Sequence, residues 1–226
     1  MDKNAYEAEE LIRQIVRITQ EEIRRRQYAA YGIPIGVSNR HVHLDRADLD
    51  VLFGPGSELT VKKALSQPGQ YAAEETVSLR GPKGELHRVR VLGPLRSQTQ
   101  VEISVADGFA LGVSPPVRES GQLEGSPGIE LIGPRGSVKK SACAIAALRH
   151  IHMTPEDASR FGVEDGRFVQ VEIIGLRGAV LNNVLVRVSD QYALEMHLDV
   201  EEANALGVAN GDRAFFHPGC RGRVTD

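Results

Sequence analysis

The chain has 226 residues, of which 41% are hydrophobic and 25% charged. That composition excludes a disordered protein and is sufficient for a substantial core in one or two domains. Lys and Arg number 27 against 30 acidic residues, a net charge of −3, so the basic footprint of nucleic-acid-binding proteins is missing. Two cysteines are too few for a disulfide framework, and neither a membrane-spanning apolar run nor a signal-peptide core is present. We therefore expect a cytoplasmic protein with no nucleic-acid or membrane partner.

The N-terminal segment, residues 1–28, is predicted to form one amphipathic helix over about 5–27. Its apolar residues recur at helical spacing, as Ala8, Leu11, Ile12, Ile15 and Ile23. Acidic residues come first and three arginines come last, which suits the helix dipole. Two roles fit this pattern: a capping or dimer-packing helix, or a docking helix for a larger assembly.

Beyond Pro34 the sequence is typical of a mainly β protein. Short apolar runs separated by Gly and Pro predict strands over 35–39, 76–80, 88–92, 101–105, 128–132, 168–174, 180–188 and 213–216. Many short strands favour barrels or sandwiches over a parallel α/β sheet. A Gly-Pro-x-Gly hairpin turn occurs at 81–84 and again at 133–136, which suggests two related β-units. The alanine-rich stretch 141–149 is predicted to be helical, and 218–226 to be a loose tail.

One local pattern occurs three times. A histidine is followed two positions later by a helix-capping residue, and an acid comes three positions after that. The three copies are His43-Leu44-Asp45 with Asp48, His152-Met153-Thr154 with Asp157, and His197-Leu198-Asp199 with Glu202. Pro155 occupies the favoured first helical position in the second copy. Each histidine is therefore expected at the end of a strand, directly before a short helix.

Two of these histidines are doubled, as His41-Val42-His43 and His150-Ile151-His152. Residues two apart in a strand point to the same face, so each pair presents two imidazoles together. Imidazole is the commonest metal ligand and suits Zn²⁺. With His197 there are five such rings, too many for one open catalytic ion and appropriate for two. The other two histidines, His87 and His217, are expected to be ordinary surface or structural residues.

An imidazole-rich site usually includes a carboxylate, and two glutamates compete for that role. Glu102 lies on a predicted strand in the middle of the chain, whereas Glu195 precedes His197 with the spacing of the His-x-His pairs. Spacing alone does not decide between them. Arg96 follows a turn and is a candidate for binding an anion. Phosphate-binding-loop and nucleophile-elbow motifs are missing, and Cys143 lies in an apolar stretch as a small buried residue.

Together these motifs resemble the PduL-type phosphotransacylases (phosphate propanoyltransferases). The resemblance covers about residues 33–216 and rests on the segments 37–44, 149–153 and 195–205 in the same order. It implies two β-barrel domains with short capping helices. The first barrel would be discontinuous, formed by 29–39 plus 148–217, and the second would be formed by 40–147.

The resemblance also implies roles for individual residues. Two zinc ions would lie between the barrels. His41, His43 and Glu102 would hold one, whose fourth position takes the coenzyme A sulfur, and His150, His152 and His197 would hold the other. Arg96 would bind phosphate. The implied coenzyme A contacts are Ser38, Lys63, Arg90 and Asn204.

The implied reaction converts acyl-CoA (propionyl- or acetyl-CoA) and phosphate into acyl phosphate and CoA. Two alternatives use the same histidines: a di-zinc acyl-CoA thioesterase or other hydrolase, and a metal-stabilised β scaffold or docking protein without activity. In the resembled family a short amphipathic N-terminal extension can direct the enzyme into a bacterial microcompartment. The helix here has either that role, through shell or cargo contacts, or a structural one, including a homodimer contact.

Overall fold

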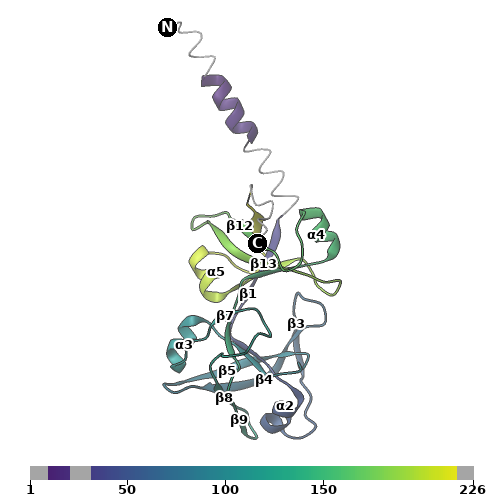
Figure 1. Cartoon of the computed structure of the whole chain (residues 1–226), viewed down its shortest axis with the longest axis vertical. Coiled ribbons are helices and arrows are strands. Elements are labelled where there is room, and N and C mark those ends of the chain that lie inside the picture. Colours follow the sequence, from purple (N-terminus) through teal and green to yellow (C-terminus); the bar gives the residue numbers. More distant parts are fainter. Residues whose placement is uncertain (1–9, 21–31, 218–226) are drawn as a thin grey trace.

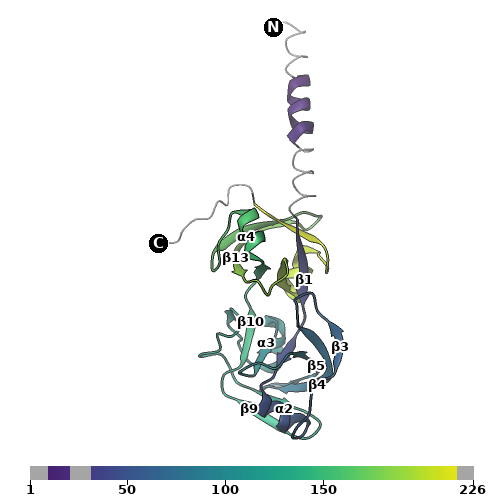
Figure 2. The same cartoon turned by 90° about the vertical axis from the view of Figure 1, so that its right-hand side faces the viewer.

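The computed structural model describes residues 10–20 and 32–217 (Figure 1). It confirms the predicted mainly β class with short helices and an N-terminal helix. Two β-sheets follow one another along the long axis of the molecule: a closed six-stranded barrel and a second sheet that curls into a half-barrel (Figures 1 and 2). The second sheet therefore does not close, although the resemblance implied a complete barrel.

Residues 10–20 are helical, as predicted; the rest of the expected helix lies outside the described residues, as does the expected tail at 218–226. The apolar side chains of this helix are exposed, with 57% of Leu11, 60% of Ile12 and 54% of Ile15 accessible. Among the described residues, no helix is both long and apolar enough to cross a membrane.

The closed barrel is built from six strands that come from both ends of the described chain. Their order around the barrel is β1 (Ile33–Ser38), β14 (Glu195–Asp199), β11 (His150–Met153), β13 (Ala179–Val188), β12 (Phe168–Ile173) and β15 (Arg213–Phe216). Its core is a cluster of apolar side chains in which Ile151, Met153 and Met196 are fully buried. Helices α4 (Pro155–Phe161) and α5 (Val200–Leu206) follow β11 and β14.

The second sheet has its own apolar core, which includes Leu44, Val91 and Leu131. Its strand order is β7 (Val117–Arg118), β10 (Ala144–Ala147), β6 (Gln100–Glu102), β2 (His41–His43), β5 (Glu85–Gly93), β4 (Tyr71–Arg80), β8 (Ile129–Ile132) and β9 (Ser137–Lys140), with β3 (Val61–Ala64) paired to β4. Helices α2 (Arg46–Phe53) and α3 (Val105–Leu111) follow β2 and β6.

The chain passes between the sheets at two equivalent places. It leaves the closed barrel after β1 and enters the second sheet at β2, and it leaves the second sheet after β10 and returns at β11. Each His-x-His pair is therefore the first strand after a crossing. These crossings are the reason we propose 29–39 plus 148–217 and 40–147 as the two domains.

All four short helices of the two sheets begin in the same way. Asp45, Ser104, Thr154 and Asp199 each accept a hydrogen bond from the backbone N–H three residues later. These bonds satisfy donors that the first helical turn leaves without partners. The three predicted helix starts are confirmed. The fourth helix start, at Ser104, was not predicted, because 101–105 was predicted to be one strand. The strand ends at Glu102, two residues before Ser104.

The stretch 141–149 is not helical: it contains the strand β10, so that prediction was wrong. β10 lies between β6 and β7, and its residues Ala144, Ile145 and Ala146 are almost completely buried. Tertiary context overrides the helix propensity of alanine here, and a short apolar run is ambiguous from pattern alone.

The repeated Gly-Pro-x-Gly segment is a hairpin turn in both places, between β4 and β5 and between β8 and β9. In each turn the first glycine N–H donates to the carbonyl of the last, at 2.9 Å. Each turn also binds the end of a helix, since the Lys83 N–H donates to the Leu111 carbonyl and the Arg135 N–H to the Leu52 carbonyl, both at 3.0 Å. Both turns belong to the second sheet, so the repeated turn does not correspond to one turn in each of two related β-units.

Candidate metal centre

Two antiparallel strand pairs hold the predicted ligands in matching register. Across β2 and β6, His41 lies opposite Glu102. Across β11 and β14, His150 lies opposite His197. The structure thus forms two triads, which we call the first triad and the second triad. The first is His41, His43 and Glu102, and the second is His150, His152 and His197; within each, the possible ligand atoms lie within 4.8 Å of one another.

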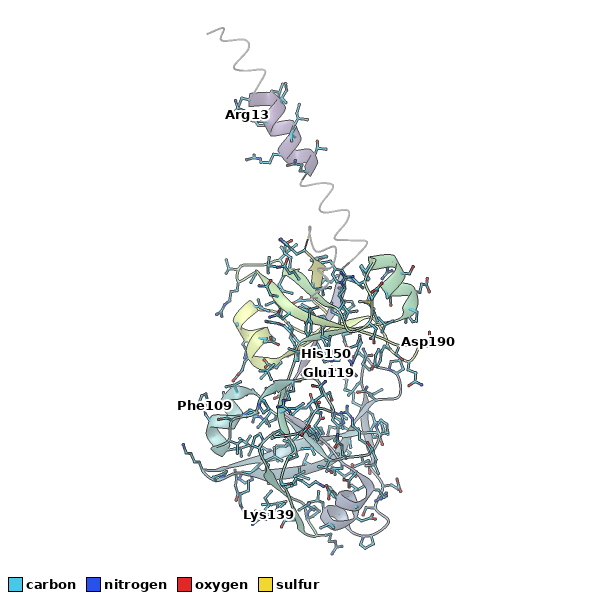
Figure 3. The ribbon with its side chains drawn as sticks, in the orientation of Figure 1. Arg13, Phe109, Glu119, Lys139, His150 and Asp190 are labelled. Carbon is cyan, nitrogen blue, oxygen red and sulfur yellow. The ribbon has the colours of Figure 1, made fainter. Side chains whose placement is uncertain are left out.

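Both triads line one cavity of about 250 Å³ where the two sheets meet. Figure 3 places His150 and Glu119 at this level between the sheets. Two arginines, Arg96 and Arg187, line the same cavity, as do Ser38, Ser120 and Tyr192. Residues from distant parts of the chain are therefore brought to one place by the two crossings between the sheets.

In the first triad the histidine rings are oriented by the backbone and by Glu102. The His41 Nδ1–H donates to the Asn39 carbonyl at 2.8 Å, which leaves Nε2 facing Glu102 Oε2 at 3.4 Å. The His43 Nε2 lies 3.9 Å from the other carboxylate oxygen. Because His41 carries its proton on Nδ1, its Nε2 lone pair is available to a cation.

Burial and the neighbouring charges together shift the pKa values of all three groups in the first triad. Burial disfavours the charged form of His41, but the Glu102 carboxylate outweighs it and raises the His41 pKa. Burial, with His41 and Arg96 nearby, holds the His43 pKa well below its usual value. Burial would raise the Glu102 pKa, yet the two histidines hold it far below the usual range. The buried carboxylate is thus stabilised by positive charge, which a proton on His41 or a bound cation supplies.

Two of the three imidazoles in the second triad, His150 and His152, have lowered pKa values. The His150 Nδ1–H donates to the Leu148 carbonyl at 2.8 Å, as His41 does to Asn39. Burial and the neighbouring His197 lower the His150 pKa to about 4, and burial with His150 lowers the His152 pKa to about 2. Metal ligands must be deprotonated, so these rings are ready to bind a cation at neutral pH.

Several buried ring nitrogens in the triads have no hydrogen-bond partner. They include His43 Nδ1 and both nitrogens of His152. Leaving a buried polar atom without a partner costs about 1–3 kcal/mol, and such atoms are uncommon in native structures. The donor sets, three imidazoles in one triad and two imidazoles with a carboxylate in the other, are those of divalent transition metals. The residues therefore fit a metal ion at each triad.

The fourth helix start explains why Glu102, and not Glu195, joins a triad. His43, His152 and His197 each stand two residues before a helix-capping residue, and Glu102 stands two residues before Ser104. Glu102 is thus the fourth copy of the histidine pattern with a carboxylate in place of imidazole. The signal is present in the sequence as Ser104 with Asp107 three residues later. Glu195 lies opposite His152 and belongs to neither triad.

One loop anchors both cavity arginines. The Arg96 guanidinium donates to Ser120 Oγ at 2.9 Å, and the Ser120 hydroxyl donates to Glu102 at 3.2 Å. Arg187 comes from β13 in the closed barrel, and its Nε lies 3.5 Å from Glu119 Oε1. Arg96 was predicted, whereas Arg187 was missed because its position depends on the pairing of β13 with β11 opposite His152.

The residues implied to contact coenzyme A are scattered. Ser38 lines the cavity. Lys63 is exposed on β3, and Asn204 is exposed on α5. Arg90 donates to the carbonyls of Ala73 and Glu74 at 2.9 and 2.8 Å. Lys63, Arg90 and Asn204 do not line the cavity, and all four contacts stay predictions.

His87, His217 and Cys143, which were predicted to take no part in the chemistry, belong to neither triad. His87 is exposed next to Ser78, and His217 lies 3.9 Å from Glu172. Neither belongs to a triad. Cys143 is fully buried in the core of the second sheet, and burial raises the pKa of its thiol to about 11.

Comparison with known proteins identifies the relatives of this chain. A family model described as phosphate propanoyltransferase matches residues 34–209. A phosphate propanoyltransferase of Rhodobacter capsulatus is 64% identical over 79% of this chain and 83% of its own length. Those of Thermotoga maritima and Salmonella typhimurium are 56% and 52% identical, over 82% and 89% of this chain and 89% and 93% of their own lengths.

Proposed function

The chain belongs to the phosphate propanoyltransferase family and is an acyltransferase, and we propose that its substrates meet in the cavity between the two triads. The reaction is acyl-CoA plus phosphate giving acyl phosphate plus CoA, with propionyl- or acetyl-CoA as the acyl donor. A single observation carries this proposal: two triads suited to cations and two arginines suited to an anion line one cavity.

We propose zinc as the metal of both triads, because imidazole and carboxylate donors suit it. When bound, the two ions supply Lewis-acid stabilisation of the thioester oxygen and of the departing thiolate, worth several kcal/mol. The first triad contains the Glu102 carboxylate and the second contains imidazoles only, so the two sites differ in their donor sets. We assign the first triad to the sulfur side of the substrate and the second to the phosphate side.

The two arginines bind and orient phosphate. Guanidinium groups recognise phosphate oxygens bidentately, and Arg96 and Arg187 approach the cavity from different sheets. Their partners Ser120 and Glu119 are neighbours in the chain, so one loop sets the positions of both groups. Phosphate held in this way presents an oxygen to the thioester carbon, which gives the rate advantage of a fixed reactant geometry.

The coenzyme A contacts are proposed with the same residues that the resemblance implied. Ser38 is at the cavity and can contact the reacting end of the substrate. Lys63 and Asn204 are exposed outside it, where the nucleotide end of a long substrate would lie. Arg90 would use the guanidinium nitrogens that do not donate to the β4 carbonyls.

The exposed apolar side chains of residues 10–20 support a contact of this helix with another protein surface. A second copy of the chain and a microcompartment component both stay proposals, as does residence inside a microcompartment. Deleting residues 1–28 and measuring the molar mass in solution tests the homodimer, because a dimer held by this helix would dissociate.

The function is tested by mixing purified protein with propionyl-CoA and following free thiol with and without phosphate. Phosphate-dependent thiol release, with acyl phosphate seen by ³¹P NMR, is expected. A thioesterase would instead release thiol at the same rate without phosphate. A metal-stabilised scaffold would release none under either condition.

A further inference from the structure

We propose that Glu195 is a positioning residue that fixes the tautomer of His197 for metal binding at the second triad. This inference rests on the proposed function. Glu195 Oε2 lies 2.9 Å from His197 Nε2, within hydrogen-bond distance. A carboxylate at Nε2 favours a proton on that nitrogen and leaves the lone pair on Nδ1. Such carboxylate–histidine pairs orient the ligand ring and increase its basicity.

The Glu195 carboxylate is held in place by the other sheet. Glu195 is only 9% exposed, and it accepts hydrogen bonds from the Ser66 hydroxyl and, at 3.4 Å, from the Gln67 amide. The Gln67 side chain also donates to the Ala193 carbonyl at 3.0 Å and accepts from the Ala193 N–H at 3.2 Å. The loop after β3 therefore fixes both the carboxylate and the backbone before β14.

A glycine makes room for this arrangement. Gly36 lies opposite His197 in the β1–β14 pair. A Cβ at position 36 would lie 2.7 Å from the Glu195 carboxyl carbon and 2.9–3.0 Å from its oxygens. Any larger residue would therefore displace the carboxylate from its present position.

The first triad has a counterpart at the equivalent position. Gln100 lies opposite His43, as Glu195 lies opposite His152. The Gln100 amide donates to Glu102 Oε1 at 2.6 Å. Gln100 and Glu195 each stand two residues before the third ligand of their triad. Gln100 is an amide donor next to a carboxylate ligand, Glu102. Glu195 is a carboxylate acceptor next to an imidazole ligand, His197. The chemistry of the neighbour matches the chemistry of the ligand in both triads.

The test compares full-length wild type with Glu195→Ala and Glu195→Gln. The first readout is the His197 tautomer in the metal-free protein, from imidazole ¹⁵N chemical shifts. The second is zinc affinity at each triad, by competition with a chelator. We expect Glu195→Ala to weaken the second triad about 10–100-fold, with the first triad unchanged, and to make the tautomer mixed. Glu195→Gln keeps an acceptor oxygen and should retain most of the affinity.

Two further variants sharpen the comparison. Gly36→Ala displaces the carboxylate without removing it and should reproduce the selective loss at the second triad. Glu172→Ala is the matched control, because it removes the carboxylate near His217 in the same barrel and should change neither readout.

Unchanged zinc affinity and unchanged tautomer in Glu195→Ala would overturn the inference. Equal losses in Glu195→Ala and Glu195→Gln would also overturn it, since the negative charge, and not hydrogen-bond acceptance, would then be what matters. If the wild type binds no metal at the second triad, the proposed function fails instead, and the tautomer measurement still reports on Glu195.

Discussion

His150 and His197 face each other across β11 and β14, with ring centroids 4.9 Å apart and planes inclined by 17°. Two stacked imidazoles cannot both be protonated at this distance without strong repulsion, and burial lowers the His150 pKa to about 4. His150 is therefore neutral at neutral pH and offers a ring lone pair to a cation. The first triad has Glu102 at the position of His197, so the same strand arrangement produces one site of three imidazoles and one site with a carboxylate.

His43→Ala and His152→Ala each remove one ligand from one triad. Each variant is expected to lose the metal of its own triad and keep the other, so that zinc content falls from two ions per chain to one. Phosphate-dependent turnover should disappear in both, because both triads face the same cavity. Zinc content by elemental analysis and the thiol assay check this, with exposed His87→Ala as the control. Full zinc content and activity in either triad variant would contradict the site assignment.

Arg96→Ala and Arg187→Ala should weaken phosphate binding and leave zinc content intact. Loss of one charged hydrogen-bonding group costs about 1.5–3 kcal/mol, so the KM for phosphate should rise on the order of 10–100-fold, with a smaller effect on the KM for acyl-CoA. Initial rates at varied phosphate concentration measure this. Arg135→Ala, an exposed arginine in a distant turn, is the control. An unchanged phosphate dependence in Arg187→Ala would remove that residue from the anion site.

The parts of the fold that local chemistry determines could be predicted from the sequence. Helix starts at Asp45, Thr154 and Asp199 depend on a capping side chain and an acid three residues later, so they are readable without knowing the fold. The pairing of imidazoles in each His-x-His segment could be predicted for the same reason. Side chains two residues apart in a strand point to the same face, which is a local property of the strand.

The remaining features depend on contacts between distant segments. The position of Arg187 in the cavity follows from the pairing of β13 with β11, which no local pattern reports. β10 was predicted as helix because its burial between β6 and β7 is not visible in its alanine-rich sequence. The open edge of the second sheet likewise depends on the complete strand order, which short apolar runs do not determine.

Cys143 is expected to be chemically inert in the folded protein. Burial raises the pKa of its thiol to about 11, so on the order of one thiol in a thousand is ionised at pH 8. In a Cys220→Ser background, a disulfide reagent should not react with the native protein at pH 8 and should react with one thiol after denaturation. Rapid reaction of the native protein would show that the core around Cys143 opens readily.

Lys140 should stabilise the fold at neutral pH and lose this effect in alkaline solution. Its Nζ lies 2.7 Å from Asp48 Oδ2, and that hydrogen bond raises the Lys140 pKa above the ordinary 10.5. A raised lysine pKa means that the stabilisation is complete below the unfolded-state pKa and disappears as the pH rises through the folded-state pKa.

Lys140→Met should therefore lower the free energy of unfolding by about 1–3 kcal/mol at pH 7. The difference from wild type should stay constant up to about pH 9 and shrink above about pH 10.5. Urea unfolding across this pH range measures it, with the exposed neighbour Lys139→Met as the control. A difference that does not depend on pH would mean that packing of the aliphatic chain, and not the ion pair, is lost.

Anomalous X-ray diffraction at the zinc edge, from crystals of the full-length protein prepared with zinc, tests most directly whether the two triads bind metal side by side. The expected result is two peaks per chain, one between His41, His43 and Glu102 and one between His150, His152 and His197, both facing the cavity with Arg96 and Arg187. Peaks only at other positions, or none, would contradict the account.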